Sequence, residues 1–299
     1  MITTTPAAPG ARGLSTEMHD GVAIHRVAAR IPGGYPVHPR AAHHVTRILR
    51  ESRPDVVHLH MGVLTPSVQV SLKPVARLGL PAVLTVHSVW GSAERWFAAL
   101  DRVTHWSRLP ILLSAVSELT AAPLRRIAGP DVPVEILHNG LDLDEWAVPR
   151  VERDARAGST AVHLVAATRF APRKRVLPML ESIRSAAARL PRDAVFATIA
   201  GRDPSSTRPG ASSPSTISRE CQPPGRLGPD ELKRLYSRAD VFLAPAIQES
   251  FGIAALEGRA AGLAVVTRAE SGVAERLTDG STGCSPPTTT PCPTRSCGS

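Results

Sequence analysis

Two glutamates flank an expected turn from a strand into a helix. In order, this segment reads Glu249, Ser250, Phe251, Gly252, Ile253 and, about one helical turn later, Glu257. Gly252 lacks a Cβ, so backbone amides beside it can approach a ligand closely. Amides at a helix start favour a phosphate or a polar sugar edge, and carboxylates accept hydrogen bonds from vicinal hydroxyls. The segment predicts a site for a hexose, a ribose or a phosphate; the alternative is two solvated glutamates.

Cations follow an earlier expected strand. Arg169, Arg173 and Lys174 lie on the loop after the strand that ends at Ala167. Two cations on one loop suit a diphosphate leaving group, because they neutralise the negative charge that develops on it. We assign this role to Arg169 and Lys174 and expect Arg173 to be solvated. The alternative is a solvated basic loop.

Histidines stand at expected strand ends in the first half of the chain. His87 follows the strand that contains Thr85, and open α/β sheets bind ligands at the carboxyl ends of strands. His58 and His60 share one strand face because side chains alternate with period two. Without a third ligand, a zinc pair is disfavoured. We expect His58 to be a satisfied core or rim histidine and His60 to face an acceptor.

The elements that must position these residues alternate between strands and helices. Strands are expected at 22–27, 55–60, 82–86, 111–116, 134–137, 161–167, 194–200, 241–244 and 264–267. Helices are expected at 39–50, 66–78, 93–106, 118–128 with Ser117 as N-cap, 178–190, 229–238 and 252–261. This alternation with short loops predicts parallel sheets covered by helices on both faces. We expect domains at 1–146 and 161–283, a charged linker at 147–160 and a disordered tail at 284–299.

Composition narrows the class of protein. The 299 residues carry a formal charge of +9, with 42% hydrophobic and 20% charged residues, as in ordinary globular chains. The excess of positive charge either results from a bias toward arginine or serves to attract a diphosphate donor or an anionic lipid. We see no nucleic-acid-binding motif and expect no nucleic acid partner. No apolar run approaches the roughly 18 residues of a membrane span, and no signal peptide is recognised. We expect a cytoplasmic protein, including peripheral attachment to the inner membrane face.

Two tracts depart from the pattern. Residues 202–224 are rich in Ser and Pro, and residues 284–299 contain no aliphatic side chain. Together they hold all four cysteines, Cys221, Cys284, Cys292 and Cys297, whose spacing matches no zinc site. Our hypothesis is translation out of frame in both tracts; the alternative is a disordered loop and a disordered tail.

The glutamate segment resembles glycosyltransferase family 4, which has the GT-B fold. The family's hallmark is Glu, seven residues and Glu, with Phe-Gly after the first Glu and Gly-x-x-Val-Val after the second; here the last part is Gly262–Val266. The family usually has Ala at Gly258 and Pro at Ala264. Residues 167–174 resemble its Gly-Arg-Leu-x-x-x-Lys-Gly segment, 230–245 its helix and strand before the glutamates, and 138–142 its Asn-Gly-Val-Asp junction. The resemblance covers about residues 14–201 and 225–283.

The resemblance implies two Rossmann-like, doubly wound domains that face a cleft. It implies a retaining hexosyltransferase that uses a nucleoside diphosphate sugar (UDP or GDP), a hydroxyl acceptor (glycolipid, inositol-type or polysaccharide precursor) and no metal. It also implies front-face attack, with the leaving phosphate as base. By resemblance, Glu249 contacts donor-sugar hydroxyls, Glu257 the ribose, Arg169 and Lys174 the diphosphate, and His87 the donor sugar. Asn139 is mainly structural and lies near the cleft. The segments His58–His60 and Thr85–Ser88 are similar to the corresponding segments of family members that act on inositol lipids.

Departures from the family leave alternatives open. Members open with a strand and a Gly-rich loop, whereas Met1–Pro6 reads like their second strand, and closing elements after Gly283 are replaced. We therefore expect the chain as written to be inactive or very weak. One alternative is a non-catalytic remnant; another is a different GT-B enzyme such as a sugar-nucleotide epimerase, against which the Arg169–Lys174 loop and Phe251-Gly252 weigh. A dehydrogenase is disfavoured because no Gly-x-Gly-x-x-Gly follows a strand.

Overall fold

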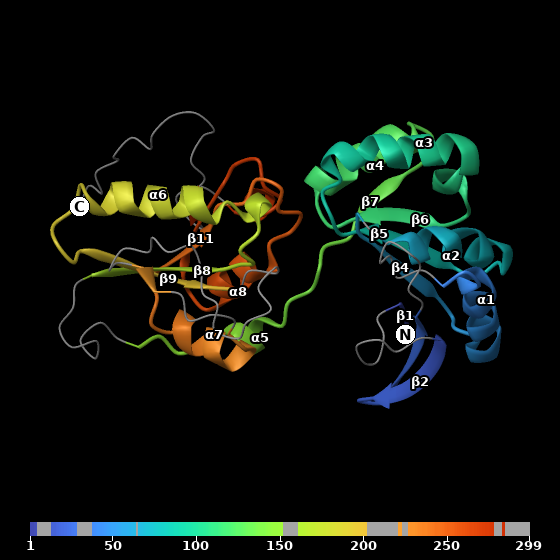
Figure 1. Cartoon of the computed structure of the whole chain (residues 1–299), viewed down its shortest axis with the longest axis horizontal. Coiled ribbons are helices and arrows are strands. Elements are labelled where there is room, and N and C mark those ends of the chain that lie inside the picture. The colour runs from blue at the N-terminus through green and yellow to red at the C-terminus, as the bar shows by residue number, and fades with distance from the viewer. Residues whose placement is uncertain are drawn as a thin grey trace. The chain divides into compact units, whose positions relative to one another are not determined.

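The chain forms two compact units, Met1–His138 and Asn139–Ser299. The computed structural model describes residues 1–4, 13–28, 38–63, 65–151, 161–201, 221–222, 227–277 and 283–284. Figure 1 shows that each unit combines sheet and helices. The boundary falls before the predicted end at Trp146, because Trp146 packs in the second unit with Tyr236 at a ring separation of 6.0 Å. That buried indole places Trp146 in the second unit.

The larger sheet of the first unit is parallel. Its strands, in spatial order, are β4 (Val57–Met61), β5 (Ala82–Val86), β6 (Leu112–Ala115) and β7 (Val134–Ile136). Helices α1 (Ala41–Ser52) and α2 (Pro66–Arg77) lie on one side, and α3 (Glu94–Thr104) and α4 (Glu118–Ala128) on the other (Figure 1). Leu84 and Val86 are fully buried, as expected for apolar runs in a sheet covered on both faces. Ser117 caps α4 by accepting a hydrogen bond from the Thr120 amide, which confirms the predicted N-cap.

A smaller sheet in the same unit was only partly predicted. It has the order β1 (Ile2–Thr3), β3 (Val22–Ala28) and β2 (Gly13–His19). β1 is parallel to β3, whereas β2 is antiparallel to β3. Asp20 and Gly21 both have positive φ, 48° and 77°, as a tight two-residue hairpin requires. The expectation of purely parallel sheets is therefore wrong for this small sheet, because the exposed strand β2 lacks the continuous apolar run that indicates a buried strand.

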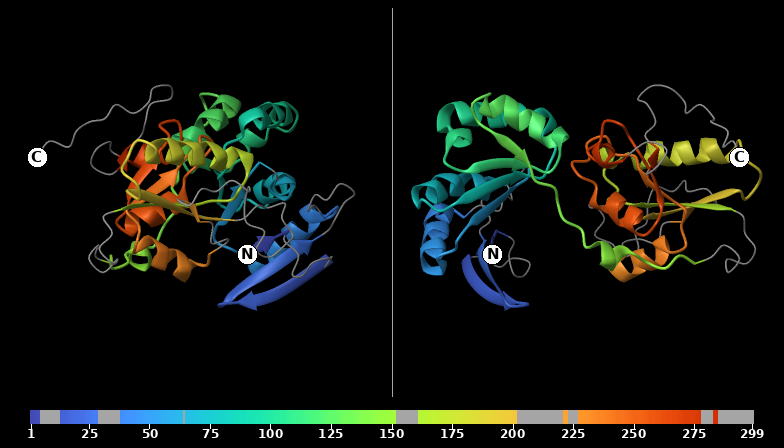
Figure 2. Two further views of the ribbon diagram at one scale, coloured as in Figure 1. Left: turned by 60° about the vertical axis from the view of Figure 1, so that its left-hand side comes forward. Right: turned by 180° about the vertical axis from the view of Figure 1, so that it is seen from behind.

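The second unit has one parallel sheet. Its strands, in spatial order, are β10 (Cys221–Gln222), β9 (Val195–Ala200), β8 (Val162–Ala167), β11 (Val241–Ala244), β12 (Ala264–Thr267) and β13 (Gly283–Cys284). Figure 2 shows this unit from two further directions. Helix α6 (Val176–Ala187) covers one face, and α5 (Leu143–Trp146), α7 (Pro229–Tyr236) and α8 (Ile253–Ala260) cover the other (Figure 1). Two apolar cores result, one around Met179 and Ile183 and one around Tyr236 and Phe242.

The tracts predicted as linker, odd loop and tail are described only in part. Residues 147–151 belong to the second unit, where the Arg150 guanidinium donates to the Ala239 carbonyl at 2.7 Å. Cys221 pairs with β9 and Cys284 with β12, so these two positions are strand rather than loop or tail. Residues 152–160, 202–220, 223–226 and 285–299 lie outside the described residues. The frame hypothesis stays a prediction.

Candidate functional site

Strand order brings the two candidate loops of the second unit together. β8 and β11 are neighbours in a parallel sheet, so the loops that follow them lie at the same carboxyl edge. Lys174 follows β8, Glu249 follows β11, and the Lys174 ammonium forms an ion pair with Glu249 Oε2. Both side chains are mostly buried, with 17% and 22% of their surfaces exposed. Two residues chosen from separate motifs are therefore direct partners.

The three cations of the loop after β8 differ in their exposure to solvent. Lys174 ends the short turn Pro172–Lys174, and Arg175, with φ of 56°, redirects the chain into α6. Arg169 and Arg173 are exposed at the same edge. Exposure of Arg173 agrees with the expectation that it is solvated. Arg169 keeps its guanidinium accessible to an anion that approaches Lys174.

The turn before α8 depends on glycine. Gly252 has φ of 78° and ψ of 53°, and a Cβ at this position would lie 2.2 Å from Val273 Cγ2. The Ala255 and Leu256 amides both donate to the Gly252 carbonyl, at 2.9 and 3.2 Å. The earlier amides of α8, including that of the exposed Ile253, therefore stand ahead of the first helical hydrogen bonds. They give this edge of the sheet a helix start that favours an anion.

The loop after β12 holds the glutamate turn in place. The Gly272 amide donates to the Glu249 carbonyl at 2.8 Å, and a Cβ on Gly272 would lie 2.2 Å from the Ser250 carbonyl oxygen. Phe251 is buried, and the Arg276 guanidinium carbon lies 3.9 Å from its ring centroid. Ser250 and Phe251 thus hold the turn in place, and direct contact of these two residues with a ligand stays a prediction.

The sequence patterns did not identify three residues of the loop after β12. Arg268 and Glu270 follow β12, the strand beside β11, and their side chains pair at 3.4 Å. Gly272 follows them and contacts the glutamate turn as described. The signal that could have found them was their place directly after an expected strand of an open parallel sheet. They join Lys174 and Glu249 at one carboxyl edge.

Glu257 occupies a different environment from Glu249. It lies on α8, and burial, followed by repulsion from Glu145, raises its pKa above the ordinary 4.5. Tyr236 is its neighbour, and burial and then the charge of Glu257 raise the pKa of the Tyr236 hydroxyl. A half-buried carboxylate of this kind gains from hydroxyl donors that favour its charged form.

The histidines of the first unit form a connected cluster on neighbouring strands. His60 Nδ1 and His87 Nε2 are 2.8 Å apart and share a hydrogen bond. The rings of His58 and His60 lie 4.1 Å apart. His58 Nε2 is 2.6 Å from Thr85 Oγ1, which is 2.6 Å from Ser114 Oγ. His58 is therefore a satisfied rim residue, as expected.

Electrostatics favour neutral imidazoles at His60 and His87. Burial, and then the other histidines, lower the pKa values of His60 and His87 from the ordinary 6.5. A neutral imidazole offers one donor and one acceptor, which suits contact with a hydroxyl. Asn139 begins the second unit, and the neighbouring His138 ring bonds the Val116 carbonyl at 3.0 Å. The histidine cluster and the Lys174–Glu249 pair are each described within their own unit.

Within the described ranges, no three His, Cys, Asp or Glu side chains converge with the geometry of a metal site. Of the helices that the structure describes, none combines the length and apolarity needed to cross a membrane.

Comparison with known proteins identifies related families for both units. Residues 2–145 match the family model described as "Glycosyltransferase Family 4", and residues 161–291 match the one described as "Glycosyl transferases group 1". Glycogen synthase of Mycobacterium tuberculosis (strain ATCC 25618 / H37Rv) is 27% identical over 251 residues, covering 79% of this chain. The chain spans 57% of the length of that relative. D-inositol 3-phosphate glycosyltransferase of Kribbella flavida is 26% identical over 93% of this chain and 72% of its own length.

Solved structures show a similar fold. Anabaena Alr3699/HepE in complex with UDP-glucose has a TM-score of 0.63 at 17% identity, covering 89% of this chain and 72% of that protein. Sucrose-phosphate synthase from Thermosynechococcus elongatus has a TM-score of 0.64 at 17% identity, covering 95% and 75%. At these identities the likeness concerns the fold alone.

Proposed function

Because the chain belongs to glycosyltransferase family 4 and has the GT-B α/β fold, we propose that it transfers a hexose from a nucleoside diphosphate sugar to a hydroxyl acceptor, with retention of configuration. The observation that carries this proposal is the Lys174–Glu249 pair at the carboxyl edge of the second sheet. One loop supplies cations for a diphosphate. The other supplies a carboxylate for hydroxyls, beside the start of α8.

In the proposed donor complex, the diphosphate takes the place of Glu249 as the partner of Lys174. A phosphate oxygen is a strong acceptor for an ammonium group, and Arg169 and the first amides of α8 lie at the same edge of the sheet. The released Glu249 carboxylate then accepts hydrogen bonds from hydroxyls of the hexose. Ser250, Phe251, Gly252 and Ile253 position this carboxylate and the helix start.

Glu257 and the first unit complete the proposal. Glu257 binds the ribose hydroxyls, which compensate its loss of hydration. His87 contacts the donor sugar, and His60 and Asn139 lie on the acceptor side. The neutral His60–His87 pair can hold a hydroxyl without adding a charge. The acceptor class includes lipid-linked hydroxyls at the inner membrane face, and no metal is required.

The proposed reaction is a front-face displacement. The acceptor oxygen forms a bond to the anomeric carbon as the bond from that carbon to the leaving phosphate breaks, and the acceptor proton passes to the leaving phosphate. Lys174 and Arg169 neutralise the charge that develops on the diphosphate. The solved Anabaena protein is described with UDP-glucose, which supports a nucleoside diphosphate hexose as donor class.

The test uses donor binding and donor cleavage, with water as the acceptor. Calorimetry with UDP-glucose and GDP-mannose measures binding, and release of UDP or GDP measures turnover. Lys174→Met and Glu249→Gln are expected to lower turnover by about 100-fold or more, the usual loss when one charge-stabilising group is removed. Arg173→Met, which removes an exposed cation of the same loop, is the matched control and is expected to behave like the parent.

Circular dichroism checks that the variants stay folded. Equal turnover in the parent, Lys174→Met and Glu249→Gln would refute the assigned roles. Donor binding without turnover in the parent, even with added hydroxyl acceptors, would refute the transferase while leaving a nucleotide-sugar-binding site.

A further inference from the structure

Helix α3 of the first unit carries apolar side chains on its outer face. Its exposed residues are four apolar side chains and two arginines: Trp96, Ala99, Leu100, Val103, Arg95 and Arg102. At about 100° per residue, the four apolar positions share an arc of about 100° on the helix surface, and we call them the α3 patch. Trp96 and Val103, at 79% and 80% exposure, are the most exposed large apolar side chains in the described part of the chain. Figure 1 shows α3 at the surface of its unit, on the side of the sheet away from α1 and α2.

Another face of α3 makes the contact with the core. Phe97 is buried and stacks on Trp90, with ring centroids 4.3 Å apart. Phe97 lies about 100° from Trp96 around the helix, so the α3 patch is not what packs the helix against its sheet. A single exposed apolar side chain is ordinary on a protein surface, but a contiguous group marks an interaction site.

Both acidic side chains of α3 have partners within the first unit. Glu94 accepts two hydrogen bonds from the Arg126 guanidinium, each at 2.8 Å. Asp101 accepts from the Ser107 amide at 2.8 Å and from the Ser107 hydroxyl at 2.9 Å. Neither carboxylate pairs with the two exposed arginines of the helix. The outer face of α3 is therefore apolar and cationic, with no acidic group.

We propose that the α3 patch docks the first unit on the surface of a bilayer that contains anionic phospholipids. A helix with Trp and Leu beside arginines is suited to lie in the plane of a membrane interface. Trp96, Leu100 and Val103 enter the boundary between headgroups and acyl chains, where an indole ring is favoured. Arg95 and Arg102 pair with lipid phosphates, which are strong acceptors for guanidinium groups.

The size and charge of the α3 patch favour a bilayer over a protein partner. From Trp96 to Val103 the patch is only about 10 Å long, whereas a stable protein interface takes about 20–30 residues from each side. A second copy of this chain would bring the same arginines face to face without a carboxylate between them, and like charges at an interface are unfavourable. The formal charge of +9 adds to this repulsion and to the attraction of an anionic surface.

The test is sedimentation of the whole chain with vesicles of phosphatidylcholine alone or mixed equally with phosphatidylglycerol. The parent is expected to bind the mixed vesicles more tightly, and salt is expected to weaken this binding. Arg95→Gln/Arg102→Gln should lower the affinity by about 25-fold, because each cation near an anionic surface contributes about fivefold. Trp96→Ser should lower it by about 10-fold or more, because a large apolar side chain no longer leaves water.

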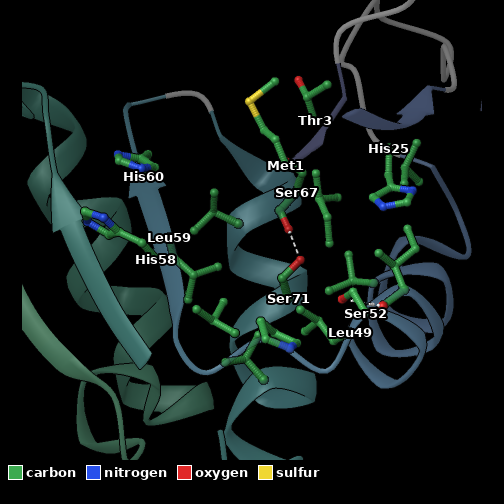
Figure 3. A pocket seen from close by; sticks show the side chains of 18 of the residues that line it. Met1, Thr3, His25, Leu49, Ser52, His58, Leu59, His60, Ser67 and Ser71 are labelled. Carbon is green, nitrogen blue, oxygen red and sulfur yellow. Dashed lines mark hydrogen bonds between the residues drawn. The ribbon is translucent and has the colours of Figure 1, made fainter. Parts of the chain in front are cut away.

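Helix α2 provides matched controls on the other side of the sheet. Lys73→Gln/Arg77→Gln changes the net charge by the same amount, and Val70→Ser removes one exposed apolar side chain. Ser67 and Ser71 of α2 line a pocket of the first unit (Figure 3), and none of the three control positions belongs to that lining. Both controls are expected to keep the affinity of the parent. Circular dichroism checks that all variants stay folded.

Tryptophan fluorescence reports whether the α3 patch enters the lipid. Of the four tryptophans, Trp90, Trp106 and Trp146 are buried, so Trp96 is the one that lipid can reach directly. Phospholipids brominated on the acyl chain are expected to quench the parent, and to leave the fluorescence of Trp96→Ser unchanged. Both measurements omit donor and acceptor, so their results are independent of the proposed transfer.

Four results would overturn the proposal. The parent could fail to bind the mixed vesicles, or both α3 variants could bind them as tightly as the parent, which would place the contact elsewhere. Binding without quenching by the brominated lipid would show attraction to the headgroups without entry of Trp96. A dimer in analytical ultracentrifugation that Trp96→Ser dissociates, with no vesicle binding by the parent, would assign the α3 patch to a second copy of this chain.

Discussion

Replacement of Gly252 by alanine is expected to destabilise the second unit through two separable effects. The backbone at Gly252 has φ of 78°, where an L-residue costs about 1–2 kcal/mol. The added methyl group would also lie 2.2 Å from Val273 Cγ2. Val273 is almost fully buried and β-branched, so its side chain has few alternative positions. Overpacking of this kind typically costs about 1–3 kcal/mol, which gives a total of about 2–5 kcal/mol.

Gly262 offers a matched control that isolates the steric effect. It lies just beyond the other end of α8 with φ of 80°, but a Cβ there meets only Arg150 Cδ at the ordinary distance of 3.5 Å. Gly262→Ala is therefore expected to cost only the backbone penalty of about 1–2 kcal/mol. The smaller entropy of the unfolded alanine chain offsets both variants equally. The difference of about 1–3 kcal/mol measures the clash.

The assay is native-state hydrogen exchange by mass spectrometry on peptides from β11 and β12, which reports opening of the second unit alone. A double-mutant cycle with Val273→Ala completes it. Val273→Ala is destabilising by itself through the cavity it leaves, but it also removes the clash. The double variant is therefore expected to be about 1–3 kcal/mol more stable than the sum of the two single changes. Equal losses for Gly252→Ala and Gly262→Ala, with additive behaviour in the cycle, would refute the steric argument.

Two further predictions follow from the pKa shifts. Because the pKa of Glu257 is raised in the folded protein, its ionised carboxylate destabilises the fold above that pKa. After allowance for solvent screening, Glu257→Gln should raise the Tm by about 1–3 °C at pH 7. The same substitution should weaken donor binding. Scanning calorimetry at pH 7 and pH 4 checks the sign, since the gain should vanish below about pH 4.5, and an equal gain at both values would contradict it. The lowered pKa values of His60 and His87 mean that the unfolded chain binds protons first as pH falls below about 6.5, so the first unit should lose stability from pH 7.5 to 5.5. Urea unfolding followed by tryptophan fluorescence measures this loss, because the buried Trp90 and Trp106 contribute to the signal. If the double variant His60→Gln/His87→Gln left the pH dependence of the unfolding free energy unchanged, the histidine cluster would be excluded as its source.

Much of the fold follows from local sequence signals. Runs such as Ala82–Val86 are apolar on both faces, which only a strand covered on two sides tolerates. Ser117 and Gly129 mark the two ends of α4 by capping chemistry that a sequence shows directly. Because both signals are local, they are visible without knowledge of the tertiary structure.

The features that the sequence did not predict depend instead on partners that are distant in the chain. The hairpin strand β2 is exposed and has no continuous apolar run, so only its pairing with β3 and the Asp20-Gly21 turn identify it as a strand. Trp146 ends the short acidic helix α5, yet its burial against Tyr236 assigns it to the second unit. Gly272 looks like an ordinary loop glycine until the Ser250 carbonyl is placed against it.

The candidate site itself combines both kinds of information. Residue types predicted a ligand-binding role for Lys174 and Glu249, but the sequence could not show that the two side chains contact one another. That contact follows from the β8–β11 pairing, which brings together two loops that are 75 positions apart in the chain. Each charge is largely removed from water, and leaving either without a partner would be costly. Lys174 and Glu249 therefore satisfy one another in this structure, and the proposed donor would have to replace both sides of their ion pair at once.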